Sequence, residues 1–215
     1  MKERPILFSG PMVRALLDGS KTQTRRIVKP QPDFETARDA LGGETRSATV
    51  VYDGAMGGIG LKRGNAIGYV FPNIHCPYGK PGDRLWVRET FAHMHRGNAA
   101  PETRHDDDVV YKADGFTPDE YVYGSWKPSI HIPRWASRIT LEVTGVRVER
   151  LQDISEADAR AEGVTIEDHH MNGYCAGETR PPSICAFREL WGSIHGAESW
   201  TANPWVWVVR LKRVK

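Results

Sequence analysis

One short basic segment combines residue types suited to chemistry on an anionic or carbonyl-bearing ligand. Lys21, Thr24 and Arg26 lie in it, beside Thr22 and Arg25. A turn that focuses ammonium and guanidinium groups can stabilise such a ligand. A threonine hydroxyl is a weak nucleophile that reacts only beside a base or a polarising group. Lys21 would be that base if burial or the nearby arginines lowered its pKa, and otherwise its charge would stabilise an oxyanion. The segment predicts either a ligand-binding turn or an ordinary solvated basic loop.

Glu89 is a carboxylate on the apolar side of a strand predicted over residues 83–91, in phase with Leu85 and Val87. A buried carboxylate must be paired, hydrogen-bonded or shifted in pKa. The arginines that are partners by type alone are Arg25, Arg26, Arg84 and Arg88. Glu89 is therefore either a ligand-binding carboxylate or half of a structural ion pair.

Residues 126–135 mix aromatic, hydroxyl, imidazole and cationic side chains. Aromatic rings beside Lys and Arg often hold single nucleotides. The polar candidates for ligand binding are Lys127, Ser129, His131 and Arg134. The alternative is a proline-rich connection whose tryptophans fill the core.

No metal or cofactor motif accompanies these candidates. The sequence has neither a CxxC nor an HExxH zinc spacing, and it lacks a Walker loop, a GxGxxG fingerprint and a GxSxG nucleophile elbow. We therefore expect no metal and no cofactor.

Short helices and alternating strands are predicted to position these residues. Helices are expected over 11–18, from Ser155 to Gly163 and from Ser183 to Gly196, each bounded by a glycine. Apolar alternation predicts strands over 83–91, 139–148 and 205–214. The apolar phase slips at Gly145, which is typical of a β-bulge in a curling sheet. The pattern predicts an α+β fold, a small and partly closed β-barrel with short flanking helices.

The 215 residues predict a single domain. Three irregular stretches, around 33–68, 93–127 and 167–182, are interpreted as long loop insertions into that domain.

Composition and charge exclude some classes of protein. Lys plus Arg is 29 and Asp plus Glu is 27, so a net charge of +2 excludes a protein that coats nucleic acid by charge alone. The longest apolar run falls far short of the roughly 20 residues that a membrane helix needs, so no membrane partner is expected. No secretory signal is visible, and the three cysteines are interpreted as reduced thiols, which predicts a cytoplasmic protein. Nothing in the sequence favours one oligomeric state.

Two of these segments resemble a known family. A short helix followed by Gly19-x-Lys21-Thr22-x-Thr24-x-Arg26, with Pro81-Gly82-Asp83-Arg84-Leu85 leading into a strand, is similar to the ASCH domain family. The string from Gly79 to Phe91 and the block from Lys127 to Arg150 look like the ASCH proteins of bacteriophages and prophages. The resemblance covers the scaffold segments and not the three insertions. It implies the β-barrel of the PUA-like superfamily.

One branch of that superfamily is a small bacterial amidohydrolase that removes the acetyl group from N-acetylcytidine, by means of a lysine, a threonine nucleophile and a glutamate. Lys21 and Thr24 match the first two within the same Lys-Thr-x-Thr pattern. The helix after Leu151-Gln152-Asp153-Ile154-Ser155-Glu156 looks like the one that carries the glutamate, and Glu162 falls at the matching place. Here the chain departs from the family, because it is about twice as long, and Glu89 has no obvious counterpart.

The resemblance implies a pocket for a nucleoside or a modified nucleotide, with Lys21, Thr24 and Glu162 as catalytic residues and Arg26 in the pocket. Two alternatives stay open. The first is a module that binds single-stranded RNA or a modified base without turnover. The second is a ribonuclease in which His131 and Lys21 act as acid and base.

Overall fold

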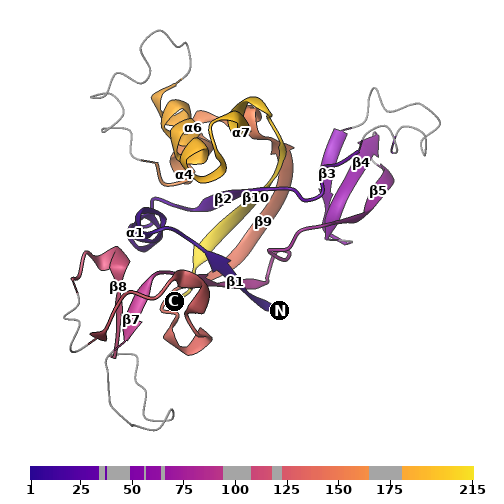
Figure 1. Cartoon of the computed structure of the whole chain (residues 1–215). Helices are drawn as coiled ribbons and strands as arrows, with labels where there is room; N and C mark the ends of the chain where they lie inside the picture. Colours follow the sequence, from indigo (N-terminus) through magenta and orange to yellow (C-terminus); the bar gives the residue numbers. More distant parts are fainter. Residues whose placement is uncertain are drawn as a thin grey trace.

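A five-stranded sheet forms the centre of the molecule in this computed structural model, which describes residues 1–33, 37, 49–55, 57–63, 66–93, 108–117, 123–164 and 181–215. The strands lie in the order β1-β6-β9-β10-β2 (Figure 1). Their bounds are β1 Glu3–Leu7, β2 Gln23–Ile27, β6 Arg84–Arg88, β9 Thr140–Arg150 and β10 Trp205–Arg213. Strands β1 and β6 pair in parallel, and every other neighbouring pair in this sheet is antiparallel.

A β-bulge bends β9 where the sequence predicts it. Gly145 pairs with Arg210, but the next residue of β10, Leu211, pairs with Val143, so Thr144 is an extra residue on β9. A bulge of this kind moves the apolar phase to the other set of positions and increases the local twist. The predicted slip at Gly145 is confirmed.

The sheet is buried on both faces. Trp207, Val209 and Leu211 of β10 belong to one apolar core, and Val206 and Val208 belong to a second core on the opposite face. Alternate side chains of a strand point to opposite faces, so one strand serves both cores. Helices α4, α6 and α7 cover the second core and form one lobe beside β2 (Figure 1).

The helices begin and end at the predicted signals. Helix α1 (Gly10–Asp18) has Pro11 in its first turn and ends at Gly19, whose φ of 85° suits glycine. Helix α4 (Glu156–Ala161) is capped by the Ser155 hydroxyl, which accepts a hydrogen bond from the Asp158 backbone N–H at 3.1 Å. The other two are α6 (Pro182–His195) and α7 (Glu198–Thr201).

Strands also form within the stretches predicted to be irregular. A three-stranded sheet contains β3 (Thr49–Asp53), β4 (Gly58–Arg63) and β5 (Ala66–His75), and Ile59 and Leu61 of β4 are buried in the first core. A two-stranded sheet pairs β7 (Phe91–His93) with β8 (Val109–Tyr111). Short 3-10 helices complete the chain, namely η4 Lys112–Asp114, η5 Ser129–His131, η6 Arg134–Ala136 and η7 Leu151–Asp153. Much of the predicted insertions, including residues 38–48, 94–107 and 165–180, lies outside the described residues.

The fold is mixed α+β, as predicted, and its main sheet is open. No strand pairing among the described residues joins its edges, β1 and β2. A side chain crosses the opening instead, because Arg26 Nη2 of β2 donates a hydrogen bond to the Leu7 carbonyl oxygen at 2.7 Å. In the described part of the chain, no helix has the length and apolar character to cross a membrane. Cys76 and Cys185 are buried and free of disulfides, and Cys175 lies outside the described residues.

Candidate functional site

Lys21 is carried to the middle of the molecule by the turn that follows α1. Its backbone N–H donates to the Ala15 carbonyl oxygen at 2.8 Å, and its backbone forms an isolated β-bridge with Glu162 at the end of α4. The two chain segments approach closely at Gly163, where an added Cβ would lie 2.7 Å from Ala15 Cβ and 2.9 Å from Lys21 Cβ. The φ of Gly163 is also positive, at 77°. Glycine at this position therefore makes the meeting of Lys21 and Glu162 possible.

Lys21 and Glu162 form a buried ion pair. The Lys21 ammonium donates to Glu162 Oε2 at 2.9 Å and to the Glu162 backbone oxygen at 2.8 Å. The side chains are 0% and 3% exposed. Burial lowers the pKa of Lys21, and the negative charge of Glu162 opposes that effect. An amine with a lowered pKa takes up and returns a proton more readily than an exposed lysine does.

The second oxygen of Glu162 is held by a charge network. Arg25 Nη1 donates to Glu162 Oε1 at 3.1 Å, and the same guanidinium pairs with Glu149 and with Asp158. Arg147 completes the network by pairing with Glu149 at 2.9 Å and with Asp158 at 2.7 Å. With Lys21 the network holds three cations and three carboxylates, so its charges balance. The network fixes the orientation of Glu162. It also shows that Arg25 binds these carboxylates, which the sequence did not indicate.

Thr24 and Arg26 point to the face of β2 opposite to Arg25. Gln23 and Arg25 face the helices, since Gln23 donates to the Asp158 backbone oxygen at 2.9 Å and Arg25 lies 5.7 Å from the Phe187 ring centre. Strand alternation turns Thr24 and Arg26 to the other face, where their partners on β10 are Val209 and Trp207 of the first core.

The Phe8 ring gathers the candidate residues on that face. The Lys21 ammonium lies 5.7 Å from the ring centre, and the Arg26 guanidinium lies 5.3 Å from it. Thr24 is only 2% exposed and stands between these two cations in the chain. The sequence carried no signal for Phe8, because an isolated apolar residue after a strand resembles any core residue.

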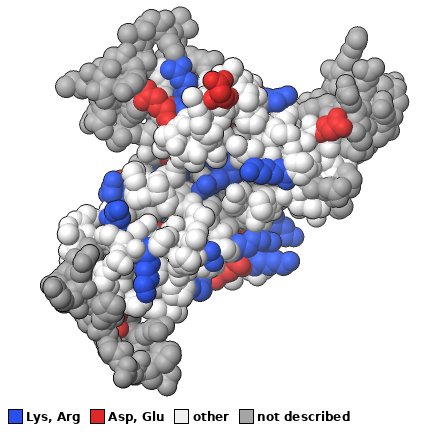
Figure 2. Space-filling view, in the orientation of Figure 1, with Lys and Arg blue, Asp and Glu red and all other residues white. Residues whose placement is uncertain are grey.

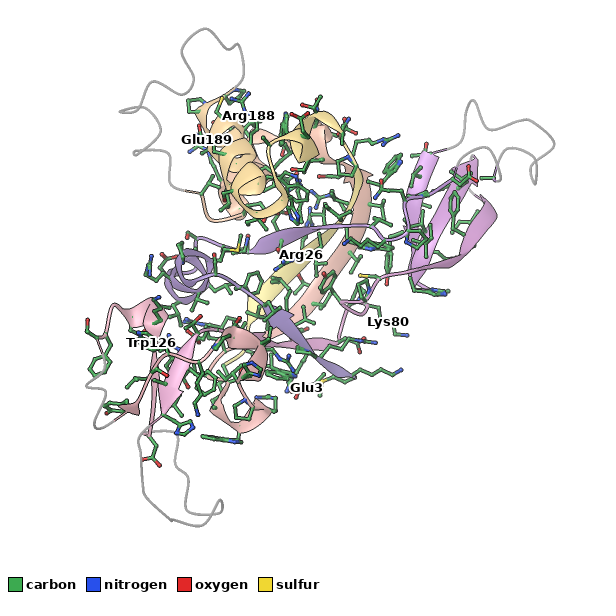
Figure 3. All side chains as sticks on the ribbon, in the orientation of Figure 1. Glu3, Arg26, Lys80, Trp126, Arg188 and Glu189 are labelled. Atoms are coloured by element: carbon green, nitrogen blue, oxygen red, sulfur yellow. The ribbon has the colours of Figure 1, made fainter. Side chains whose placement is uncertain are left out.

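Arg26 keeps hydrogen-bonding capacity that the protein does not use. Its Nε is buried and has no partner among the described residues, although its Nη2 is bonded to Leu7. Its charge also acts on Tyr78, whose pKa is raised by burial and lowered in part by Arg26. Figure 3 shows Arg26 on β2, near the centre of the molecule.

Two cavities flank the Lys21–Glu162 pair. One of about 340 Å³ is lined by Lys21, Thr22 and the end of α1. The other, of about 310 Å³, is lined by Gly163 and Val164 together with residues of α1 and α6. Thr24 lines neither of these two cavities.

Glu89 belongs to a different cluster. It is 1% exposed, as predicted, but it is bound by Arg138, which none of the sequence candidates included. Both carboxylate oxygens accept from Arg138 at 3.0 Å, and Arg138 also binds Asp114 at 2.7 Å. Burial raises the pKa of Glu89 despite this partner. Arg138 stacks 4.0 Å from the Tyr111 ring centre, so Glu89 fastens β6 to the β7–β8 hairpin.

The remaining candidates lie on the segment that packs against β6 and β7. Lys127 Nζ is 2.6 Å from His93 Nε2. Arg134 pairs with Glu3 at 3.0 Å, while Ser129 and the exposed His131 form η5. The side-chain contacts of Lys21 in the described structure are with Glu162 and Phe8, so the predicted pairing of His131 with Lys21 is not formed.

Comparisons with known proteins yield no relative. No protein-family model matches the chain, and neither a curated protein nor a solved structure matches it. Among the described residues, no group of three or more His, Cys, Asp or Glu side chains is arranged to hold a metal ion.

Proposed function

We propose that the protein is an amidohydrolase that acts on an N-acylated pyrimidine nucleoside, with Thr24 as nucleophile and Lys21 and Glu162 as the proton-handling pair. The observation that carries the proposal is the fully buried Lys21–Glu162 contact of 2.9 Å, with the pKa of Lys21 lowered by burial. A purely structural ion pair gains little from such complete desolvation, because the penalty offsets much of the attraction. The resemblance to ASCH domains supports the same assignment, and with it a PUA-like barrel for the curled sheet.

The proposed reaction has two stages, acylation of Thr24 and hydrolysis of the acyl ester. A proton first passes from the Lys21 ammonium to the Glu162 carboxylate. The Thr24 hydroxyl then attacks the acyl carbon while its own proton passes to the neutral Lys21 amine, and the oxygen of the carbonyl becomes an oxyanion. Arg26, with its Nε donor unpaired among the described residues, is suited to stabilise that oxyanion. Lys21 gives the proton to the nitrogen as the amine leaves, and Glu162 returns its proton to Lys21. Water then attacks the acyl ester while the Glu162 carboxylate takes a proton from it and passes that proton to the Thr24 oxygen, which frees Thr24 and yields a carboxylic acid.

The test is mass spectrometry on a panel of N-acylated nucleosides, N-acetylcytidine among them. We expect the wild type to release the free amine and Thr24→Val to lose at least about a thousandfold in rate, as a nucleophile deletion should. Thr24→Ser should retain measurable activity. The matched control is Thr22→Val, because Thr22 is an exposed hydroxyl two residues away. Equal activity of Thr24→Val and Thr22→Val on any substrate of the panel would remove Thr24 from the mechanism.

A binding module without turnover is the second candidate, favoured by arginines that cover the buried Trp86 of β6 and by an exposed tryptophan close by. The guanidinium of Arg88 lies 4.6 Å from the Trp86 ring centre and that of Arg134 lies 5.9 Å from it. Nearby on η6, Trp135 is 39% exposed. Exposed aromatic and arginine planes stack on unpaired bases. Under this function, Trp135→Ala would weaken binding of single-stranded RNA several-fold, and no acylated nucleoside would be turned over.

A further inference from the structure

A third cavity lies where the N-terminal strand meets the three-stranded sheet. It has a volume of about 420 Å³ and is lined by Lys2 and Arg4 of the N-terminal segment, by His75 and Cys76, and by Lys80 and Asp83 of the following turn. Figure 3 labels Lys80 at this edge of the molecule, with Glu3 of β1 nearby.

The turn over residues 76–83 is built closely around one ion pair. Asp83 accepts hydrogen bonds from the Lys2 backbone N–H at 2.8 Å and from Arg4 Nη1 at 2.9 Å. These bonds lower the pKa of Asp83 to about 2, so its charge is permanent and offsets that of Arg4. Gly79 makes this packing possible, since its φ is 92° and an added Cβ would lie 2.6 Å from Arg4 Nη1.

The cavity keeps an excess of positive charge. Once Asp83 and Arg4 cancel, the side chains of Lys2 and Lys80 remain, and neither has an ion-pair partner within the described ranges. In the space-filling view, blue side chains gather at this edge of the molecule (Figure 2). Two lysines at a concave surface concentrate anions there.

A buried hydroxyl without a partner among the described residues belongs to Tyr52, which interacts electrostatically with residues of the cavity. The phenol oxygen of Tyr52 is buried and makes no hydrogen bond in the described part of the protein. Burial raises the pKa of Tyr52 to about 12, and three residues that line the cavity, Cys76, Asp83 and Arg4, act on it electrostatically. A buried donor without an acceptor is costly, and the oxygen of a ligand would satisfy it.

We propose that this cavity binds a phosphate group, held by Lys2 and Lys80, with Tyr52 as a neutral donor and the Arg4–Asp83 pair as its scaffold. Phosphate is borne by a nucleotide and by an RNA backbone alike.

Direct binding tests the site without turnover. Fluorescence anisotropy with a labelled ten-nucleotide RNA should show binding that weakens about tenfold or more in the double variant Lys2→Glu/Lys80→Glu. Each lost phosphate contact should also reduce the slope of log affinity against log salt by about 0.7. Tyr52→Phe should weaken binding several-fold without changing the salt slope, because the phenol is uncharged. The matched control is Lys112→Glu, an exposed lysine on η4.

Competition identifies the source of the phosphate. Displacement by a mononucleotide or inorganic phosphate at low concentration indicates a nucleotide, and displacement by oligonucleotides alone indicates an RNA backbone; both outcomes support the site. If the double variant and Lys112→Glu have the same affinity for RNA and the same salt slope, the proposed phosphate site is overturned. Repeating the measurement with Thr24→Val separates the two proposals, because RNA binding should survive when catalysis is absent.

Discussion

The buried pair of Lys21 and Glu162 makes a strong prediction about stability. In Glu162→Gln the amide still occupies the space, but the Lys21 ammonium and the Arg25 guanidinium lose a charged acceptor at 2.9 and 3.1 Å. Both cationic side chains are 0% exposed, so water cannot replace that acceptor. Removing one partner of a buried ion pair costs about 3–5 kcal/mol of unfolding free energy. Arg25 keeps Glu149 and Asp158, which puts the expected loss near the lower end, at about 3 kcal/mol.

The lowered pKa of Lys21 also predicts how the free energy of unfolding changes with pH. The pKa of Lys21 is lowered in the folded state, so between that pKa and the unfolded value near 10.5 the unfolded chain binds more protons. The free energy of unfolding contributed by Lys21 therefore rises with pH in that window. Without Glu162 the pKa of Lys21 falls further, because the opposing negative charge is gone, so the window widens in Glu162→Gln.

The assay is urea unfolding of the wild type and Glu162→Gln at several pH values from 7 to 9.5. The matched control is Glu156→Gln, which removes an exposed carboxylate of the same helix that pairs with Arg160. Exposed pairs contribute at most about 1 kcal/mol. If both glutamine variants lose the same stability, and neither shows the extra pH dependence, the reasoning about the buried pair is refuted.

Further predictions concern the glycine and the carboxylates around the site. Gly163→Ala should lose roughly 2–4 kcal/mol of unfolding free energy in thermal unfolding, because residue 163 has a positive φ and the added Cβ would lie 2.7 Å from Ala15 Cβ. Gly19→Ala should lose only about 1–2 kcal/mol, because residue 19 has a positive φ but open space around the added Cβ. The pKa of Glu89 is raised in the folded state, so its contribution to stability falls as pH rises from the unfolded value near 4.5 through the higher folded value. Urea titrations of Glu89→Gln should lack that slope. Asp83 has a pKa of about 2, so the stability that its carboxylate contributes is lost as pH falls from about 4 toward 2. Asp83→Asn should be less stable than the wild type near neutral pH and should not show this loss of stability in acid. Equal losses in the two alanine variants, or unchanged slopes in the carboxylate variants, would contradict these expectations.

Local signals in the sequence predicted much of the scaffold. Pro11, Gly19 and Ser155 act within a few residues of themselves, so the ends of α1 and the start of α4 follow from the sequence. The slip of apolar phase at Gly145 likewise predicted the bulge in β9. Such signals depend on backbone conformation and on hydrogen bonds between near neighbours, which a single sequence contains.

The apolar periodicity of the sequence predicted less where the burial of a residue depends on segments that are distant in the chain. The sequence pattern treats residues 33–68 as irregular, yet β3 and β4 form there because Ile59 and Leu61 find a core made by other parts of the chain. On α6 the apolar residue Ile194 is 48% exposed. An apolar residue is buried only if some other element covers it, and the sequence does not state which element that is.

The choice of ionic partners was decided by the tertiary structure. Alternation along one strand predicted that Glu89 is buried, and the structure confirms it. Alternation does not select Arg138, which lies 49 positions along the chain, over arginines nearer in sequence. Lys21 and Glu162 are 141 positions apart and meet only because Gly163 lets α4 approach the turn after α1. Ion pairs act over a few ångströms in space, and only the completed packing of sheet and helices determines which charges come that close.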